Sequence, residues 1–256
     1  MKFFLLLFIV MFLGVGCFGP TRGQVKKARS LYRLGVNQSN KGMHRQAMVV
    51  LKQAEKLNPR SYWIQEALGG TLMRMKMPKL ALVHFRKALD INKKSPRGWN
   101  NLGTAYMVMK NWKEAIKSFQ MALKNILYQT PCFAQMNLGW SYHKAKNNKK
   151  ALFYLGRSIA VCPRLCQGHR LLGKVFFESK NYSKAVVSFR KLSQYCKKYP
   201  EGHYLLAQSL VKEKQYSKAI QSLRLCLKLS EKYPTIKSAC QSLMNKSQTL
   251  VTHYVP

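Results

Sequence analysis

Acidic residues are scarce in this sequence. The 256 residues include 8 Asp and Glu against 45 Lys and Arg, which gives a formal net charge of +37 at pH 7. No two carboxylates lie within four residues of each other, so the pattern offers no paired general acid and base. A glycine-rich phosphate loop, a G-x-S-x-G elbow and an H-E-x-x-H metal motif are also missing. We therefore predict a protein that is not an enzyme, acts on no small-molecule substrate, and needs neither a cofactor nor a metal.

The excess of positive charge indicates attraction to anionic surfaces, with a strength that falls as salt rises. Nucleic acid, phospholipid headgroups, lipopolysaccharide and acidic protein segments all carry the required charge. A general lysine bias in the source proteome would give the same composition. The basic residues are spread over all faces without the interleaved aromatic platforms of a single-strand binder, so we expect nucleic acid not to be the partner.

The chain begins with a short apolar run. After Met1 and Lys2, residues 3–16 are apolar or glycine, and Cys17 follows directly. A helix of that length reaches about 21 Å, short of the roughly 30 Å hydrocarbon core, so residues 1–16 are interpreted as a cleaved signal peptide. The Gly16-Cys17 junction resembles the bacterial lipoprotein signal, in which the cysteine is lipidated, although Gly14 stands where leucine is preferred.

Lipidation of Cys17 would anchor the mature chain to a membrane. Phe18 in the next position provides no acidic retention signal of the inner-membrane type. We therefore expect a lipid-anchored protein on the periplasmic face of the outer membrane, with residues 17–27 as its lipidated N-terminus and linker. The alternative is ordinary cleavage nearby, which would leave a soluble periplasmic protein.

A repeat of 34 residues follows the linker. The clearest unit runs Trp99-x2-Leu102-Gly103-x2-Tyr106 and continues with Ala115, Phe119 and Ala122, which is the tetratricopeptide repeat (TPR) pattern. Counted from this unit, the repeats are separated by 34, 34, 36, 34 and 34 residues. They begin at Ala28, Tyr62, Pro96, Cys132, Cys166 and Pro200.

Small residues recur at two places in each repeat. A Leu-Gly pair (Leu-Ala in the last repeat) precedes an alanine that is followed four residues later by Leu or Phe. Two antiparallel helices can approach closely where side chains are small, and no repeat buries its apolar face alone. We therefore predict an all-α fold, a right-handed superhelix (α-solenoid) of six TPR helix pairs over residues 28–233, with a capping helix and tail over 234–256.

Six cysteines remain after Cys17, which suits an oxidising compartment. Repeat phasing places Cys132 at the start of the first helix and Cys162 at the end of the second helix of one pair, and Cys166 and Cys196 likewise in the next pair. These two helix ends are adjacent in an antiparallel pair. We predict these two disulfides. A local Cys162–Cys166 bond and free buried thiols are the alternatives, and Cys226 with Cys240 is a weaker candidate for a third bond.

TPR arrays usually bind a partner through the inner face of the first helix in each repeat, so we predict the binding groove there. Its apolar members suit an amphipathic helix or an extended segment of a partner protein. Some of them would be unavailable if curvature or the N-terminal helix covered them. The predicted groove comprises Trp63, Met73, Arg97, Asn100, Met107, Phe133, Met136, Trp140, Arg170 and Lys174.

The chain resembles the six-TPR outer-membrane lipoproteins called pilotins, which assist type IV pilus biogenesis. The most specific stretch is the two-residue insertion before the fourth repeat, Leu127-Tyr128-x-x-Pro131, which leads into Asn137-Leu138-Gly139-Trp140. The resemblance implies that the protein binds the pilus secretin subunit and promotes its outer-membrane targeting and multimer assembly. A TPR lipoprotein that scaffolds peptidoglycan hydrolases or other envelope complexes is the main alternative, and a basic nucleic-acid-binding protein is a further one.

Overall fold

The computed structural model describes residues 19–254, so the predicted signal peptide and the predicted lipidation site Cys17 lie outside the described residues. Within this range the chain forms thirteen helices and no strand. None of these helices is long and apolar enough to cross a membrane. The helices are α1 (Arg22–Asn40), α2 (His44–Leu57), α3 (Tyr62–Arg74), α4 (Pro78–Ile91), α5 (Pro96–Val108), α6 (Trp112–Leu123), α7 (Pro131–Lys144), α8 (Asn148–Val161), α9 (Cys166–Glu178), α10 (Tyr182–Tyr195), α11 (Pro200–Lys212), α12 (Tyr216–Leu229) and α13 (Pro234–Tyr254).

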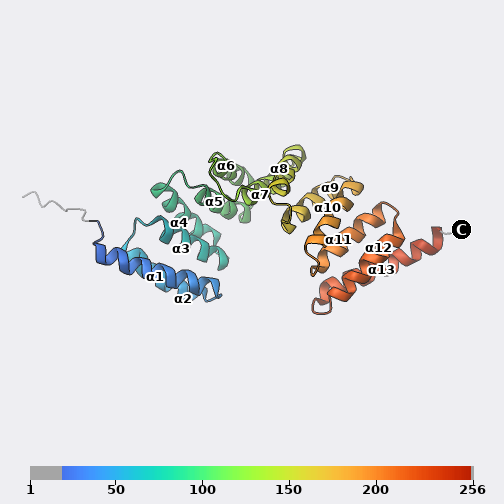
Figure 1. Ribbon diagram of the computed structural model, residues 1–256, viewed down its shortest axis with the longest axis horizontal. Coiled ribbons are helices and arrows are strands. Elements are labelled where there is room, and N and C mark those ends of the chain that lie inside the picture. The colour runs from blue at the N-terminus through green and yellow to red at the C-terminus, as the bar shows by residue number, and fades with distance from the viewer. Residues whose placement is uncertain (1–18, 255–256) are drawn as a thin grey trace, which may run out of the picture.

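The helices form six antiparallel pairs that follow one another along an arch (Figure 1). Each second helix packs on its own partner and on the first helix of the next pair, and α13 covers the last pair. First helices also contact one another, from α1 with α3 through to α7 with α9. The predicted all-α TPR superhelix with a terminal cap helix is therefore confirmed.

The first helix begins earlier than the repeat pattern predicts. Residues 22–27 were expected in the linker, but they form the opening turns of α1. The Thr21 hydroxyl accepts the Gln24 backbone N–H at 3.2 Å, and the Gln24 side chain accepts the Thr21 backbone N–H at 2.8 Å. This capping box satisfies N–H groups that would otherwise lack partners, so the helix starts at Arg22 and not at Ala28.

The small residues allow the two helices of a pair to approach closely. A Cβ added to Gly173 of α9 would lie 2.5 Å from a ring carbon of Phe189 on α10, and a Cβ on Gly103 would lie 2.7 Å from the ring of Phe119. Both rings are almost completely buried. A Cβ at either crossing point would therefore force the buried ring to shift.

We expect Gly173→Ala to lower the free energy of unfolding by about 1–3 kcal/mol, because the buried Phe189 ring cannot move aside without strain. Gly156→Ala is the matched control, since a Cβ on this α8 residue meets nothing within 4 Å. We expect that change to be neutral or to stabilise by about 0.5–1 kcal/mol, because alanine favours the helix. Urea unfolding compares the two, and equal stabilities would contradict the close approach.

Each first helix of the six pairs ends in the same turn. Met77 N–H donates to Leu72 O at 2.9 Å and Lys76 N–H to Met73 O at 3.1 Å, which is a Schellman motif. The residue at its centre has a positive φ, a conformation that costs a residue with a Cβ about 1 kcal/mol more than glycine. The first pair has Gly42 there, with φ 82°, but the others have Lys76, Lys110, Lys146, Lys180 and Lys214, with φ of 59–61°.

Candidate protein-binding surface

The first three pairs enclose a pocket on the side of their first helices. It has a volume of about 440 Å³ and is called the inner pocket below. A second pocket of about 560 Å³ lies next to it, between α1 and the α2–α3 link. Tyr32 and Trp63 line both pockets. The inner pocket is lined mainly by Tyr32 and Val36 of α1, Trp63, Glu66 and Met73 of α3, and Arg97 of α5.

Trp63 is the most prominent side chain at this site. It is 54% exposed, and its ring meets Tyr62 edge to face with 5.0 Å between ring centroids. Tyr62 is itself fixed, because its hydroxyl and the Ser95 hydroxyl lie 2.6 Å apart in a buried hydrogen bond. A large aromatic surface is therefore held in place and remains open to a partner.

A buried carboxylate joins α3 to α5 beside Trp63. Glu66 is 4% exposed; it forms an ion pair with Arg97, whose Nε lies 3.1 Å from Oε1, and it accepts a hydrogen bond from Asn101 Nδ2 at 2.8 Å. Burial raises the pKa of Glu66, and the nearby Arg97 guanidinium offsets part of that rise. The Arg97 side chain is 66% exposed, so it carries positive charge to the rim of the inner pocket.

We expect Glu66→Gln to stabilise the protein at pH 7. Because the pKa of Glu66 is higher in the folded chain than in the unfolded chain, ionisation increasingly disfavours the fold as pH rises from about 4.5 through the raised pKa. Glutamine mimics the protonated carboxyl and removes that loss. Melting temperatures at pH 4 and pH 7 test this: the variant should match the parent at pH 4 and exceed it at pH 7, whereas a lower value at pH 7 would contradict the sign.

The structure brings together only part of the predicted groove. Trp63, Met73 and Arg97 line the inner pocket. Phe133 is 45% exposed, but it lies on α7, outside both pockets. Lys174 is half-buried on α9.

Four other members of that groove are less available than the repeat pattern suggested. Met136 is 9% exposed and belongs to the core shared by the second to fifth pairs, so it offers little surface to a partner. Met107 and Trp140 are half-buried against the same core. Asn100 is also half-buried, and its side-chain oxygen is buried without a hydrogen-bond partner.

Arg170 is held within the array. It donates to Glu201 of the next pair and to Gln167, each at 3.0 Å. With this charge already paired and Met136 buried, the structure offers a pocket at the first three pairs in place of one groove along the inner face. The contribution of α1 to that pocket was missed, although the same repeat positions counted from Ala28 give Tyr32 and Val36.

A larger pocket lies on the side of the second helices, and the repeat pattern did not predict it. This outer pocket, of about 1260 Å³, lies among α4, α6 and α8 beside the α6–α7 link. The link contains the two-residue insertion, and its Ile126 is 94% and Leu127 81% exposed. The insertion is therefore the signal that could have pointed to it. Among the described residues no group of three or more His, Cys, Asp or Glu could hold a metal ion.

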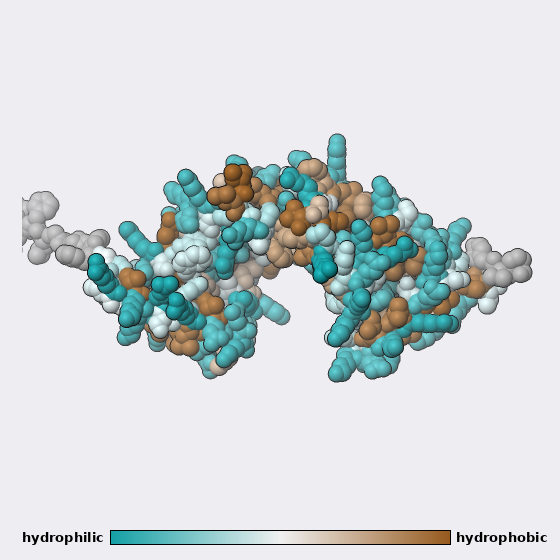
Figure 2. Space-filling model, in the orientation of Figure 1, coloured by the Kyte–Doolittle hydropathy of each residue, from teal (hydrophilic) through white to brown (hydrophobic). Residues whose placement is uncertain are grey.

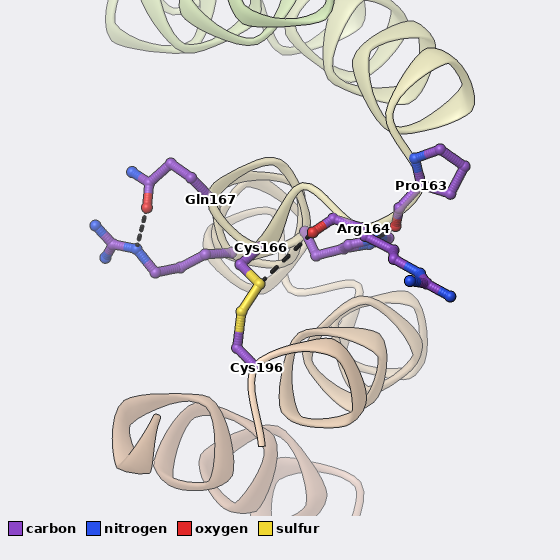
Figure 3. Close-up of a disulfide and its surroundings, with 7 residues drawn as sticks. Pro163, Arg164, Cys166, Gln167 and Cys196 are labelled. Carbon is purple, nitrogen blue, oxygen red and sulfur yellow. Dashed lines mark hydrogen bonds between the residues drawn. A yellow bond between two sulfur atoms is a disulfide. The ribbon is translucent and has the colours of Figure 1, made fainter. Parts of the chain in front are cut away.

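The described cysteines are joined in pairs. Cys132 is bonded to Cys162 and Cys166 to Cys196, with Cα atoms 6.0 and 6.3 Å apart. Figure 3 shows the second bond, which links the start of α9 to the end of α10. A third bond joins Cys226 to Cys240, between α12 and α13. All three lie in the C-terminal half, away from the inner pocket.

Comparison with known proteins identifies the repeat. Models of the tetratricopeptide repeat match residues 28–61, 96–125 and 200–233. The type IV pilus assembly protein PilF of Pseudomonas aeruginosa is 30% identical over 136 residues, which are 53% of this chain and 54% of that protein. The chain thus spans about half the length of this curated relative.

Two solved structures share the fold. That of Pseudomonas aeruginosa PilF has a TM-score of 0.73 at 22% identity, covering 86% of this chain and 99% of that one. That of PilW, described as a widely conserved type IV pilus biogenesis factor, has a TM-score of 0.76 at 21% identity, covering 82% and 96%. Both likenesses extend over most of the described helices.

Proposed function

We propose that this TPR repeat protein, which is related in sequence to the type IV pilus assembly protein PilF, acts in type IV pilus biogenesis. In this proposal it is an outer-membrane lipoprotein, anchored through Cys17, that binds the pilus secretin subunit without catalysing a reaction. It promotes the targeting of that subunit to the outer membrane and its assembly into multimers. The observation that carries the proposal is the 30% identity to PilF over 136 residues.

The inner pocket is the part of the surface best suited to hold a secretin segment. Exposed aromatic side chains supply much of the binding energy at protein interfaces, and Trp63 offers one that is already fixed. An apolar side chain of the partner would contact Trp63 and Tyr32. The exposed Arg97 guanidinium, which is ion-paired with Glu66 through Nε, has its other N–H groups at the rim to donate to a partner acceptor. Repeat proteins bind extended or helical segments on their inner surfaces in this way.

Deletion of the gene, followed by gel electrophoresis of heat-resistant secretin multimers, tests the proposed role. We expect multimers to disappear and monomeric secretin to accumulate. The wild-type gene should restore them. Unchanged multimers in the deletion strain would remove the secretin role.

A matched pair of variants locates the binding site. Trp63→Ala should weaken secretin binding by about 2 kcal/mol, because an anchoring aromatic surface is lost. Phe153→Ala is the control, since Phe153 has a similar exposure of 57% but lies on α8, away from the inner pocket. Recovery of peptidoglycan hydrolases in place of secretin from detergent extracts would favour the scaffold alternative.

A further inference from the structure

The turns between the two helices of each pair concentrate positive charge along one edge of the array. We define this basic edge as residues 40–46, 74–80, 108–114, 144–150, 178–184 and 212–218, which join each first helix to its second. These segments contain sixteen Lys and Arg against three Glu. All sixteen basic side chains are exposed.

The opposite edge has a lower charge density. Its six links between pairs, taken over segments of the same length, are residues 57–63, 91–97, 125–131, 161–167, 195–201 and 229–235. They contain eight Lys and Arg against two Glu. A uniform lysine bias would charge both edges alike, so the difference belongs to the basic edge itself.

The lysines at the centre of the turns strengthen this asymmetry. Lys76, Lys110, Lys146, Lys180 and Lys214 all have φ near 60°, where glycine is favoured. Only the first pair has the favoured residue, Gly42. Lysine thus recurs at a backbone position that does not favour it, and the repetition indicates a use for the charge.

The basic edge keeps its charge free of internal neutralisation. Two of its three acidic residues pair elsewhere: Glu114 with Lys117, and Glu178 with His143. Over the described range, none of the sixteen basic residues forms an ion pair with a carboxylate. The ammonium groups are therefore available to an external anion.

Apolar groups accompany the lysines. Met43 and Met77 are each 43% exposed, and with Gly42 and Met75 they line a hollow of about 560 Å³ at the turns of the first two pairs. Trp112 stands half-buried two residues after Lys110. Lysines with long apolar stems beside methionine and tryptophan are the composition that suits a membrane–water interface.

We propose that the basic edge docks on the surface of a bilayer that contains anionic phospholipids. Fourteen of its sixteen basic residues are lysine, whose compact charge serves the diffuse attraction to a charged bilayer. A single-stranded nucleic acid needs exposed aromatic faces for its bases, whereas Trp112 and Tyr182 of this edge are half-buried. The docking is independent of the secretin role and of any lipid on Cys17.

Vesicle sedimentation with residues 19–256 tests the proposal. This chain contains all thirteen helices and three disulfides, and it lacks Cys17 and the apolar run before it. We expect binding to phosphatidylcholine vesicles that contain about 30% phosphatidylglycerol, no binding to pure phosphatidylcholine, and a loss of binding as salt rises from about 0.05 to 0.5 M. Equal binding to both vesicles, or to neither, would overturn it.

The turn lysines provide a variant that removes charge without disturbing the fold. Replacing Lys76, Lys110, Lys146, Lys180 and Lys214 together by glycine suits their positive φ, and circular dichroism checks the melting temperature. We expect affinity for the anionic vesicles to fall about tenfold or more. Arginine at the same five positions should preserve it. If the glycine variant melts early, asparagine, which also tolerates this conformation, makes the same charge change.

The control removes the same charge from the opposite edge. Lys93, Lys94, Lys197, Lys198 and Lys232, all exposed, are replaced together by glutamine. We expect this variant to keep its affinity within about threefold, because these side chains face away from the bilayer. An equal loss in both variants would show that only net charge matters and would overturn a docking edge. Binding to duplex DNA that exceeds binding to the vesicles would do the same.

Discussion

Replacing Phe119 by alanine is expected to lower the free energy of unfolding by about 3–5 kcal/mol. The Phe119 ring is fully buried on α6 and fills the space opposite Gly103, in the core shared by the second to fifth pairs. Alanine would leave a cavity there that the surrounding helices cannot close, because Gly103 has no side chain to move into it. Urea unfolding followed by circular dichroism measures the loss.

Phe153→Ala serves as the control for this change. Phe153 is 57% exposed on α8, so its removal should alter stability by no more than about 0.5 kcal/mol. If the two variants were equally stable, the stacking of rings against glycine would not be what holds the pairs together.

Removal of the Cys132–Cys162 disulfide is expected to have the second large effect. The bond closes a loop with a sequence separation of 30. A cross-link of that span stabilises the folded protein by about 3–4 kcal/mol, because it lowers the conformational entropy of the unfolded chain. We therefore expect the Cys132→Ala, Cys162→Ala double variant to unfold at a clearly lower urea concentration. Non-reducing peptide mapping of the parent first establishes the pairing, and Cys162 joined to any residue other than Cys132 would contradict it.

The effect should be confined to one part of the array. Residues 19–131 contain no cysteine, and each pair contacts only its neighbours. Hydrogen exchange should therefore accelerate in α7 and α8 on loss of the bond and stay unchanged in α1 to α4. Equal acceleration throughout would mean that the array unfolds as one unit.

The repeat architecture could be predicted because its physical cause is local in sequence. Gly69 and Ala81 recur with the period of the helix pairs, and small residues at those places are what allow close packing. The start of α1 could not be predicted from the same pattern. Thr21 and Gln24 lie before the first repeat, and their reciprocal hydrogen bonds extend the helix.

The binding surface was only partly predictable, because side-chain availability depends on contacts between different pairs. Met136 occupies a repeat position that faces inward, yet it is buried in the core that the second to fifth pairs share. Arg170 is paired with Glu201, which is 31 residues away in sequence. Spacing within one repeat does not reveal either contact. Trp63 stays exposed, and the hollow of the arch that Figure 2 shows remains open.

Site-specific photo-cross-linking tests most directly whether the secretin subunit binds at the inner pocket. A photoreactive phenylalanine analogue placed at position 63 or at position 153 samples two sites of similar exposure, 54% and 57%. Irradiation of cells, followed by detection of secretin in the adducts, should give a cross-linked secretin band from position 63 and none from position 153. A secretin band from position 153 alone, or the same absence of secretin at both positions, would contradict the account.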